Sequence, residues 1–567
     1  MVRKIFGFFD GSLDRKINSL NQAALLLGSF AFLSQFLAFL RDRLLAHIFG
    51  VGPELDIYYA AFRIPDFIFV TVASVVSLSV LVPFIIEKAA IDKGEEDRRT
   101  LRTFIDAIFS FFTLLILTVS VVTYFFLPAL SEMLFKGLAP EAMEQVVFLS
   151  RILLLSPVVL GFSNLFGSIT QAYQRFTLYA LAPLLYNAGI IIGIISLTEK
   201  LGIVGVAVGV AVGALLHVLV QLPFIFKEGL LPRFRSSFDW QIISKVVAIS
   251  IPRTLTLSMS SLVLIFLVAF ASRMETGSIT ILSFSINLQS LPLSLIGVSY
   301  SLAAFPTLSR YFQEKNLKAF LEQMQTSTRF IIFWSLPLTA LLIILRAQVV
   351  RVLLGTGLFD WEATRLTAAA VALFVVSSMF QSLLLLFMRG FYSAGATMKP
   401  FVINLIASIF LIVSTYAFVE VFYSAESFRY FVSALLKVED VPGSVVLMLP
   451  LGFSIGIIAN VIMLWIAFER EFKGFSQGVM RTLFVSVSAS VIMGGVAYVG
   501  LNLMSRLIVT DTLVGVFSQG FIAGVGALVA GVLVLILLRS RELEEIWRSI
   551  RGRFWKANVI ATDPEIV

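Results

Sequence analysis

Long apolar stretches recur along almost the whole chain and are separated by short polar segments. Many reach the roughly 20 residues that a helix needs to cross a bilayer, whereas a membrane β-barrel shows short segments of alternating hydrophobicity. The pattern therefore predicts an all-α polytopic membrane protein. We expect about fourteen transmembrane helices, with centres near residues 30, 70, 115, 160, 188, 214, 257, 293, 336, 378, 411, 456, 491 and 526.

The composition supports this class and excludes several others. The 567 residues are 58% hydrophobic and 14% charged, whereas soluble domains are about 45–50% apolar and about 25% charged. The chain has no cysteine and only two histidines, which argues against thiol chemistry, iron–sulfur clusters and a histidine-built metal site. It also lacks the phosphate-loop motif of ATPases. We therefore expect a transporter rather than an enzyme, with no cofactor and no metal.

The distribution of basic residues predicts how the helices are oriented. Most of the 43 Lys and Arg residues fall in the two tails and the even-numbered loops when the N-terminus is placed inside. Cytoplasmic loops are enriched in Lys and Arg, so both termini should be cytoplasmic. The net charge of +8 fits loops that face anionic membrane lipids, and we expect no nucleic-acid partner.

Three segments outside the spans have patterns of their own. The tail 1–19 is basic and lacks a cleavage site, which predicts a retained cytoplasmic tail. The outer connection 423–444 contains an aromatic cluster and is a candidate interfacial helix. Charged and apolar residues alternate from Glu542 to Arg553, which predicts a basic amphipathic helix on the inner membrane surface.

Short motifs in the first half of the chain recur in the second half at a nearly constant distance along the sequence. Pro83 corresponds to Pro306, and the pair Pro183 and Asn187 corresponds to the pair Pro400 and Asn404. A repeat of six spans keeps its orientation, so the halves would form two lobes with a substrate site between them, suited to alternating access. The predicted division is a tail 1–19, an N-lobe 20–226, a C-lobe 227–470, two further spans in 471–540 and a tail 541–567.

Ionisable residues within the spans are the strongest candidates for a binding site, because each costs a few kcal/mol in lipid unless it faces a cavity or a partner. Arg41 and Asp42 close the first span, and Asp56 opens the second, where it could also cap the helix. Arg63 lies two turns inside the second span, and Arg253 lies near the start of the seventh, where it could also snorkel to the interface. We therefore expect an anionic amphiphile as substrate, since arginine binds phosphate oxygens in pairs.

The sequence around these residues resembles a known family. The run Phe39-Leu40-Arg41-Asp42-Arg43, followed by Ile48-Phe49-Gly50-Val51-Gly52, Asp56 and Ala61-Phe62-Arg63-Ile64-Pro65, is similar to the opening of MurJ (MviN) proteins. These are lipid II flippases of the MOP exporter superfamily. Further similarities include Gly355-Thr356-Gly357-Leu358-Phe359-Asp360, and the resemblance covers roughly residues 20–540.

The resemblance implies a fourteen-helix protein of the bacterial inner membrane that turns lipid II from the cytoplasmic to the outer leaflet for peptidoglycan biosynthesis. In that family a cationic central cavity takes the diphosphate, and a groove bounded by the last two spans holds the lipid tail. Arg41, Asp42 and Asp56 match cavity positions, and Arg63 falls where a basic residue is usual. We expect a monomer, with membrane lipids and proteins of peptidoglycan synthesis as further candidate partners.

The chain departs from the family pattern at three positions where an arginine is usual. They hold Gln35, Phe69 and Asn287 here. This difference keeps other functions open. They are a flippase for another polyprenyl-diphosphate-linked glycan, a MATE-like ion-coupled exporter, and a scaffold that kept the fold without transport.

Overall fold

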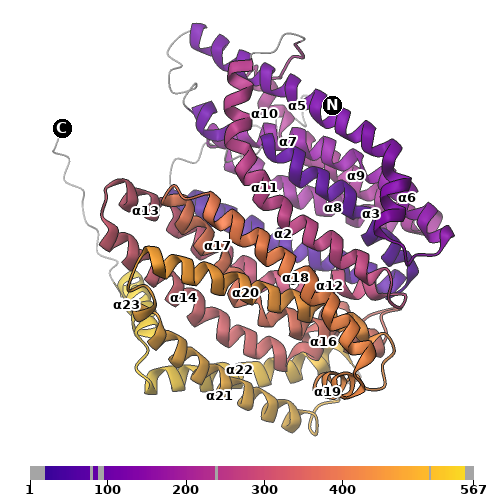
Figure 1. The fold of residues 1–567 in the computed structure, drawn as a ribbon, viewed down its shortest axis with the longest axis vertical. Helices are drawn as coiled ribbons and strands as arrows, with labels where there is room; N and C mark the ends of the chain where they lie inside the picture. The colour runs from indigo at the N-terminus through magenta and orange to yellow at the C-terminus, as the bar shows by residue number, and fades with distance from the viewer. Residues whose placement is uncertain (1–19, 77–80, 87–94, 236–239, 510–511, 556–567) are drawn as a thin grey trace. The chain divides into compact units, whose positions relative to one another are not determined.

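The computed structural model describes residues 20–76, 81–86, 95–235, 240–509 and 512–555, and these are folded almost entirely into helices (Figure 1). The predicted tail 1–19 lies outside the described residues. The elements of the first half are α2 (Leu20–Phe49), α3 (Pro53–Val72), η1 (Ala73–Val76), α5 (Glu95–Leu134), α6 (Pro140–Leu153), α7 (Leu155–Ala172), α8 (Phe176–Leu201), α9 (Ile203–Leu219), α10 (Leu222–Lys227) and α11 (Trp240–Ala271).

The second half continues in the same manner. Its elements are α12 (Ser278–Pro292), η2 (Leu293–Val298), α13 (Ser299–Gln313), α14 (Leu317–Ile344), α15 (Arg346–Leu354), α16 (Trp361–Val376), α17 (Ser378–Ser393), α18 (Met398–Ser424), α19 (Glu426–Leu436), η3 (Ser444–Leu447), α20 (Met448–Glu471), η4 (Ser476–Gly478), α21 (Met480–Met504), α22 (Leu513–Leu537) and α23 (Arg541–Trp555).

The all-α polytopic class is confirmed. Within the described residues, 11 helical segments are long and apolar enough to cross a membrane, and each contains one predicted span centre. The remaining three centres, near residues 30, 70 and 257, lie in α2, α3 and α11. The count of fourteen spans is consistent with this arrangement and stays a prediction.

Proline and side-chain caps explain several helix starts and breaks. Pro53 and Pro140 occupy the first turns of α3 and α6, where the missing N–H costs no helical hydrogen bond. Asn316 and Thr512 accept hydrogen bonds from the first turns of α14 and α22. Both segments predicted to form surface helices are helical, as α19 and α23, and their place at the membrane surface stays a prediction.

The helices form two compact units, each assembled from several segments. The first takes in the described residues up to Ser285 with Leu353–Ala370 and Asn404–Phe453, and the second takes in Ile286–Val352, Val371–Ile403 and the described residues from Ser454 onward. The division of the chain into two six-helix lobes stays a prediction.

In the first unit, α8 and α9 pack closely because glycines face each other (Figure 1). A Cβ atom added at Gly193 would lie 2.4 Å from the Cα of Gly209, and one added at Gly189 would lie 2.3 Å from the Cα of Gly213. The glycines therefore allow a backbone approach that larger residues would block. Small residues serve this purpose widely in membrane helices.

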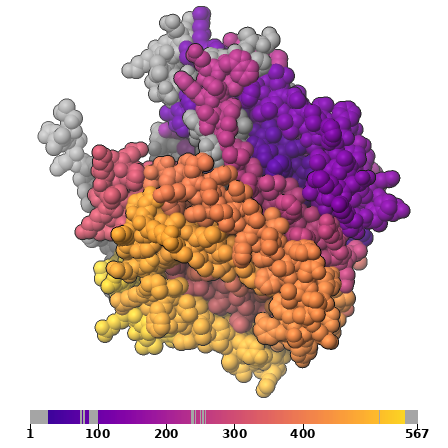
Figure 2. All heavy atoms as spheres, viewed as in Figure 1, coloured from indigo at the N-terminus to yellow at the C-terminus, as the bar shows by residue number. Residues whose placement is uncertain are grey.

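The second unit has an aromatic core around Phe387 and Phe468, which are both fully buried. Edge contacts join their rings to Trp465 and Phe475. The helices α21 and α22 lie side by side (Figure 1) and expose many apolar side chains, among them Phe484, Val491 and Leu537. Their yellow surface in Figure 2 is therefore suited to contact with lipid.

Candidate functional site

Arg41 lies near the C-terminal end of α2 and forms an ion pair with its neighbour Asp42. The Nε and Nη2 atoms of Arg41 donate to Oδ1 of Asp42 at 2.9 and 2.7 Å. Its Nη1 donates to Oδ1 of Asn187 on α8 at 3.3 Å. The Arg41 side chain is 20% exposed and that of Asp42 only 4%. The guanidinium is thus held in a fixed place but stays accessible.

Arg63 occupies the middle of α3 and has unused donor capacity. Its Nη2 donates to Oγ of Ser283 at 3.3 Å, whereas its buried Nε finds no partner within the described residues. Asp66 lies three residues further on and interacts electrostatically with Arg63. Positions three apart share one face of a helix, so both charges point the same way. Asp66 is exposed, and for a charge inside a predicted span this indicates an aqueous space rather than lipid.

The helix backbone around Arg63 is supported from a neighbouring helix. Pro65 has no N–H for the carbonyl of Ala61, four residues earlier. The hydroxyl of Ser150 on α6 donates to that carbonyl at 3.0 Å instead. The contact satisfies the orphaned acceptor and fixes α3 directly beside Arg63.

Aromatic hydroxyls complete the polar cluster. Tyr58 and Tyr59 on α3 lie near Arg41, and Tyr186 on α8 lies near both Arg41 and Asp66. The hydroxyl of Tyr59 is buried without a partner in the described part of the chain. We name the set Arg41, Asp42, Tyr58, Tyr59, Arg63, Asp66, Tyr186 and Asn187 the α2–α3–α8 cluster.

Asp56 has a different environment from the other predicted residues. Its carboxylate is buried and accepts hydrogen bonds from the backbone N–H of Gly277 at 2.6 Å, from that of Thr280 at 2.7 Å, and from Thr280 Oγ1 at 2.7 Å. These donors lie at the N-terminal end of α12, where carboxylates stabilise the helix dipole. Asp56 therefore caps α12 rather than its own helix and joins α3 to it.

Two segments of the family resemblance meet next to this cap. The backbone N–H of Leu358 donates to the carbonyl of His47 at 3.1 Å, and Nδ1 of His47 lies 2.9 Å from Oγ1 of Thr356. Gly50 and Gly357 have φ angles of 65° and 58°, and the Cβ atoms that each lacks would collide with the opposite segment. Glycine is therefore required at both positions of this junction.

The remaining predicted positions fall outside the cluster. Arg253 lies in α11, but its side chain is outside the described part of the structure. At the positions where the family usually has arginine, Gln35 is half-buried on α2, and Phe69 packs against the apolar core of the first unit. Asn287 belongs to α12.

Sequence reasoning missed Asp66, Tyr58, Tyr59 and Tyr186. The spacing of Asp66 from Arg63 would have indicated a shared helix face. The tyrosines carried no comparable signal, because their place beside Arg41 depends on how α3 and α8 pack. In the part of the chain that the structure describes, no three His, Cys, Asp or Glu side chains form a group that could hold a metal ion.

The second unit contains a separate apolar groove of about 270 Å³. Its walls come from α14, α17, α20 and α21. They are formed by Ile332, Met379, Phe380, Leu383, Val461, Ile462, Trp465, Ile466 and Leu483. With no polar lining, the groove is chemically suited to a hydrocarbon chain.

Comparisons with known proteins identify a family. A family model described as lipid II flippase MurJ matches residues 45–518. The probable lipid II flippase MurJ of Vibrio cholerae serotype O1 is 27% identical over 397 residues, which cover 68% of this chain and 75% of the relative. The lipid II flippase MurJ of Burkholderia cenocepacia is 24% identical over 412 residues, which cover 71% of this chain and 78% of the relative.

Solved structures show the same fold. A structure described as lipid II flippase MurJ in an inward closed conformation matches with a TM-score of 0.68 and 22% identity, covering 92% of this chain and 100% of that chain. An inward-facing multidrug resistance MATE family transporter of the MOP superfamily matches with a TM-score of 0.62 and 16% identity, covering 84% of this chain and 98% of that chain. The resemblance found in the sequence is therefore confirmed.

Proposed function

Since the chain belongs to the lipid II flippase MurJ family, we propose that it carries lipid II from the cytoplasmic to the outer leaflet of the bacterial inner membrane. The observation that carries this proposal is the pair of partly exposed arginines, Arg41 and Arg63, in helices that the sequence predicts to cross the membrane. A diphosphate needs such donors, because an unpaired anion is costly within the bilayer. The protein is a multi-pass membrane transporter, and we propose that both termini are cytoplasmic.

Binding exchanges one anion for another at these arginines. Without substrate, Asp42 pairs with Arg41, and Asp66 interacts with Arg63, so the four charges balance. A diphosphate displaces the carboxylates by binding two oxygens to each guanidinium. The unpaired Nε of Arg63 and the hydroxyl of Tyr59 supply donors that the substrate-free protein does not use. The two arginines thus have an anionic partner with and without substrate.

Alternating access requires the outer contacts to break. In the orientation that the basic residues predict, Asp56 with the start of α12 and His47 with Thr356 and Leu358 lie at the outer side. Their separation opens a path for the headgroup. An inside-negative membrane potential then opposes the return of an anionic headgroup by about 2.3 kcal/mol per charge per 100 mV.

The prenyl tail does not need the polar path. We propose that it stays in lipid or rests on apolar protein surface near α21, as in the groove of the second unit. This keeps the hydrocarbon out of water during the whole cycle, which agrees with the cost of exposing apolar area.

The test is rescue of cells depleted of their own lipid II flippase. The wild-type chain should restore labelling of new lipid II by an impermeant probe at the outer face, and Arg41→Ala with Arg63→Ala should abolish it. Arg310→Ala is the matched control, because Arg310 is exposed and pairs only weakly with Glu314 at 3.9 Å. Normal labelling in the double variant would contradict the assigned role of the cluster.

A second function has one observation in its favour. Phe69 is partly buried and packs against an apolar core at a position where the family usually has arginine, so one expected positive charge is replaced by an apolar side chain. A flippase for a different polyprenyl-diphosphate-linked glycan would follow from such a change. Folded, membrane-inserted protein that fails to rescue lipid II labelling would favour this function.

A further inference from the structure

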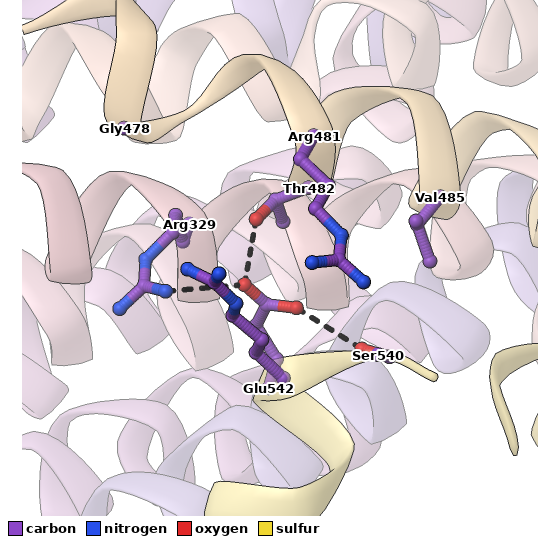
Figure 3. Close-up of a pocket in the computed structure, with 8 residues that line it drawn as sticks. Arg329, Gly478, Arg481, Thr482, Val485, Ser540 and Glu542 are labelled. Atoms are coloured by element: carbon purple, nitrogen blue, oxygen red, sulfur yellow. Dashed lines mark hydrogen bonds and ion pairs between the residues drawn. The ribbon is translucent and has the colours of Figure 1, made fainter. Parts of the chain in front are cut away.

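A cluster of arginines surrounds a buried carboxylate where α23 meets α14 and α21. Glu542 is 3% exposed and accepts hydrogen bonds from Thr482 Oγ1 at 2.6 Å and Ser540 Oγ at 3.0 Å. Nη1 of Arg329 lies 3.7 Å from the same carboxylate. Figure 3 shows Arg329 and Arg481 extending toward it from different helices.

The charges in this cluster do not balance. Arg329 is matched by Glu542 and by Glu545, whose Oε1 lies 3.7 Å from its Nη2. Arg481 and Arg541 are exposed and have no carboxylate partner within the described residues. Among the described residues, Nη2 of Arg481 donates only to the backbone carbonyl of Arg539, at 3.5 Å. Surplus positive charge therefore remains at the surface of the cluster.

The cluster encloses only a small hollow. The hollow at its centre has only about 20 Å³, close to the space that one water molecule needs. A phosphate group cannot enter it, because the hollow is too small and the buried carboxylate of Glu542 is part of its lining. An anion would instead bind at the mouth, where the guanidiniums of Arg481 and Arg541 are accessible.

Exposed apolar side chains lie on the same helices as the arginines. Met480 and Phe484 on α21 are 54% and 71% exposed, Leu537 at the end of α22 is 79% exposed, and Trp547 on α23 is 63% exposed. Such basic residues lie at the ends of apolar helices and beside an amphipathic helix. This is the arrangement expected at the depth of the lipid headgroups. The cluster also belongs to the side that the basic residues predict to be cytoplasmic.

We propose that Arg481 and Arg541, beside the docked carboxylate of Glu542, bind the phosphate of an anionic phospholipid of the inner leaflet. The acyl chains then lie along the exposed faces of α21 and α22. The lipid phosphate neutralises the surplus positive charge of Arg481 and Arg541 and stabilises the packing of α23 against the transmembrane helices. This site is separate from the α2–α3–α8 cluster and does not depend on lipid II transport.

The test uses the purified full-length protein in mixed micelles and follows its melting temperature as lipid is added. Phosphatidylglycerol should raise the melting temperature of the wild type, whereas phosphatidylcholine and inorganic phosphate should not. In Arg481→Gln with Arg541→Gln, apparent affinity for phosphatidylglycerol should fall about fivefold for each arginine removed. Arg310→Gln with Lys318→Gln removes two exposed charges elsewhere and should respond as the wild type does.

Several outcomes would overturn the proposal. They are an equal response of the Arg481 and Arg541 double variant, no response of the wild type to phosphatidylglycerol, and an equal response to inorganic phosphate, which would indicate a free-anion site. If the double glutamine variant does not fold, Arg481→Lys with Arg541→Lys keeps the charge but loses paired binding of two oxygens. It should then bind phosphatidylglycerol more weakly than the wild type, and equal binding would contradict the proposal.

Discussion

Removing the carboxylate of Asp56 should release the start of α12 from α3. The carboxylate is 4% exposed and is the shared acceptor for the N–H groups of Gly277 and Thr280 and for the Thr280 hydroxyl. Asp56→Ala leaves these donors without an acceptor in a buried place. Asp56→Asn keeps one oxygen for Thr280 but places an amide donor against the N–H of Gly277.

The magnitude follows from the hydrogen bonds that are lost. A hydrogen bond to a charged group contributes about 1.5–3 kcal/mol, but three bonds to one carboxylate do not add, because water can enter and satisfy part of the loss. We expect the local opening of this segment to become easier by about 3 kcal/mol in Asp56→Ala and by about 1.5 kcal/mol in Asp56→Asn. These values correspond to roughly 100-fold and roughly tenfold changes in an equilibrium constant.

The assay is amide hydrogen exchange of the purified protein, read on peptides that contain Gly277 and Thr280. Exchange at these amides should quicken in the order wild type, Asp56→Asn, Asp56→Ala, because opening precedes exchange. Glu362→Gln is the control, since it removes an exposed carboxylate at the start of α16. If exchange in Asp56→Ala is no faster than in the wild type, the carboxylate does not stabilise the start of α12. The role proposed for Asp56 in closing the outer side would then be wrong.

Three further predictions concern stability. Gly193→Leu should lower the melting temperature, because its Cβ would lie 2.4 Å from a Cα atom of α9, whereas Gly495→Leu, which meets open space, should not. Paired hydrogen bonds from Arg365 at 2.6 and 2.8 Å lower the pKa of Asp440 to about 2, from 3.8. The stabilisation of the folded protein by this ion pair is therefore present above about pH 4 and lost as the pH falls toward 2. The melting temperature of Asp440→Asn should depend less on pH in this range than that of the wild type. An unchanged dependence would refute a stabilising role of the pair. Glu542→Gln should make α23 more sensitive to limited proteolysis, because it leaves the mostly buried Arg329 with only the more exposed carboxylate of Glu545. Protection equal to that of the wild type would contradict this role of Glu542.

The sequence by itself determined the class of the protein and the places of most helices. A span is recognised from the hydropathy of about 20 neighbouring residues, so its signal is local. The same kind of local signal identified Arg41 and Arg63, because a charge within an apolar stretch is costly in lipid unless it faces a cavity or a partner. The amphipathic pattern after residue 541 predicted α23 for the same reason.

Tertiary structure decided what each of these residues contacts. Asp56 could be expected to cap its own helix, yet it caps α12, which begins more than two hundred residues later. Tyr186 and Asn187 join Arg41 only because α8 packs beside α2, and Glu542 becomes buried only because α23 folds back onto α14 and α21. Hydropathy depends on neighbours along the chain, whereas the partner of a charge depends on which helix faces meet. That pairing is decided by side-chain packing between distant segments, and no local pattern in the sequence records it.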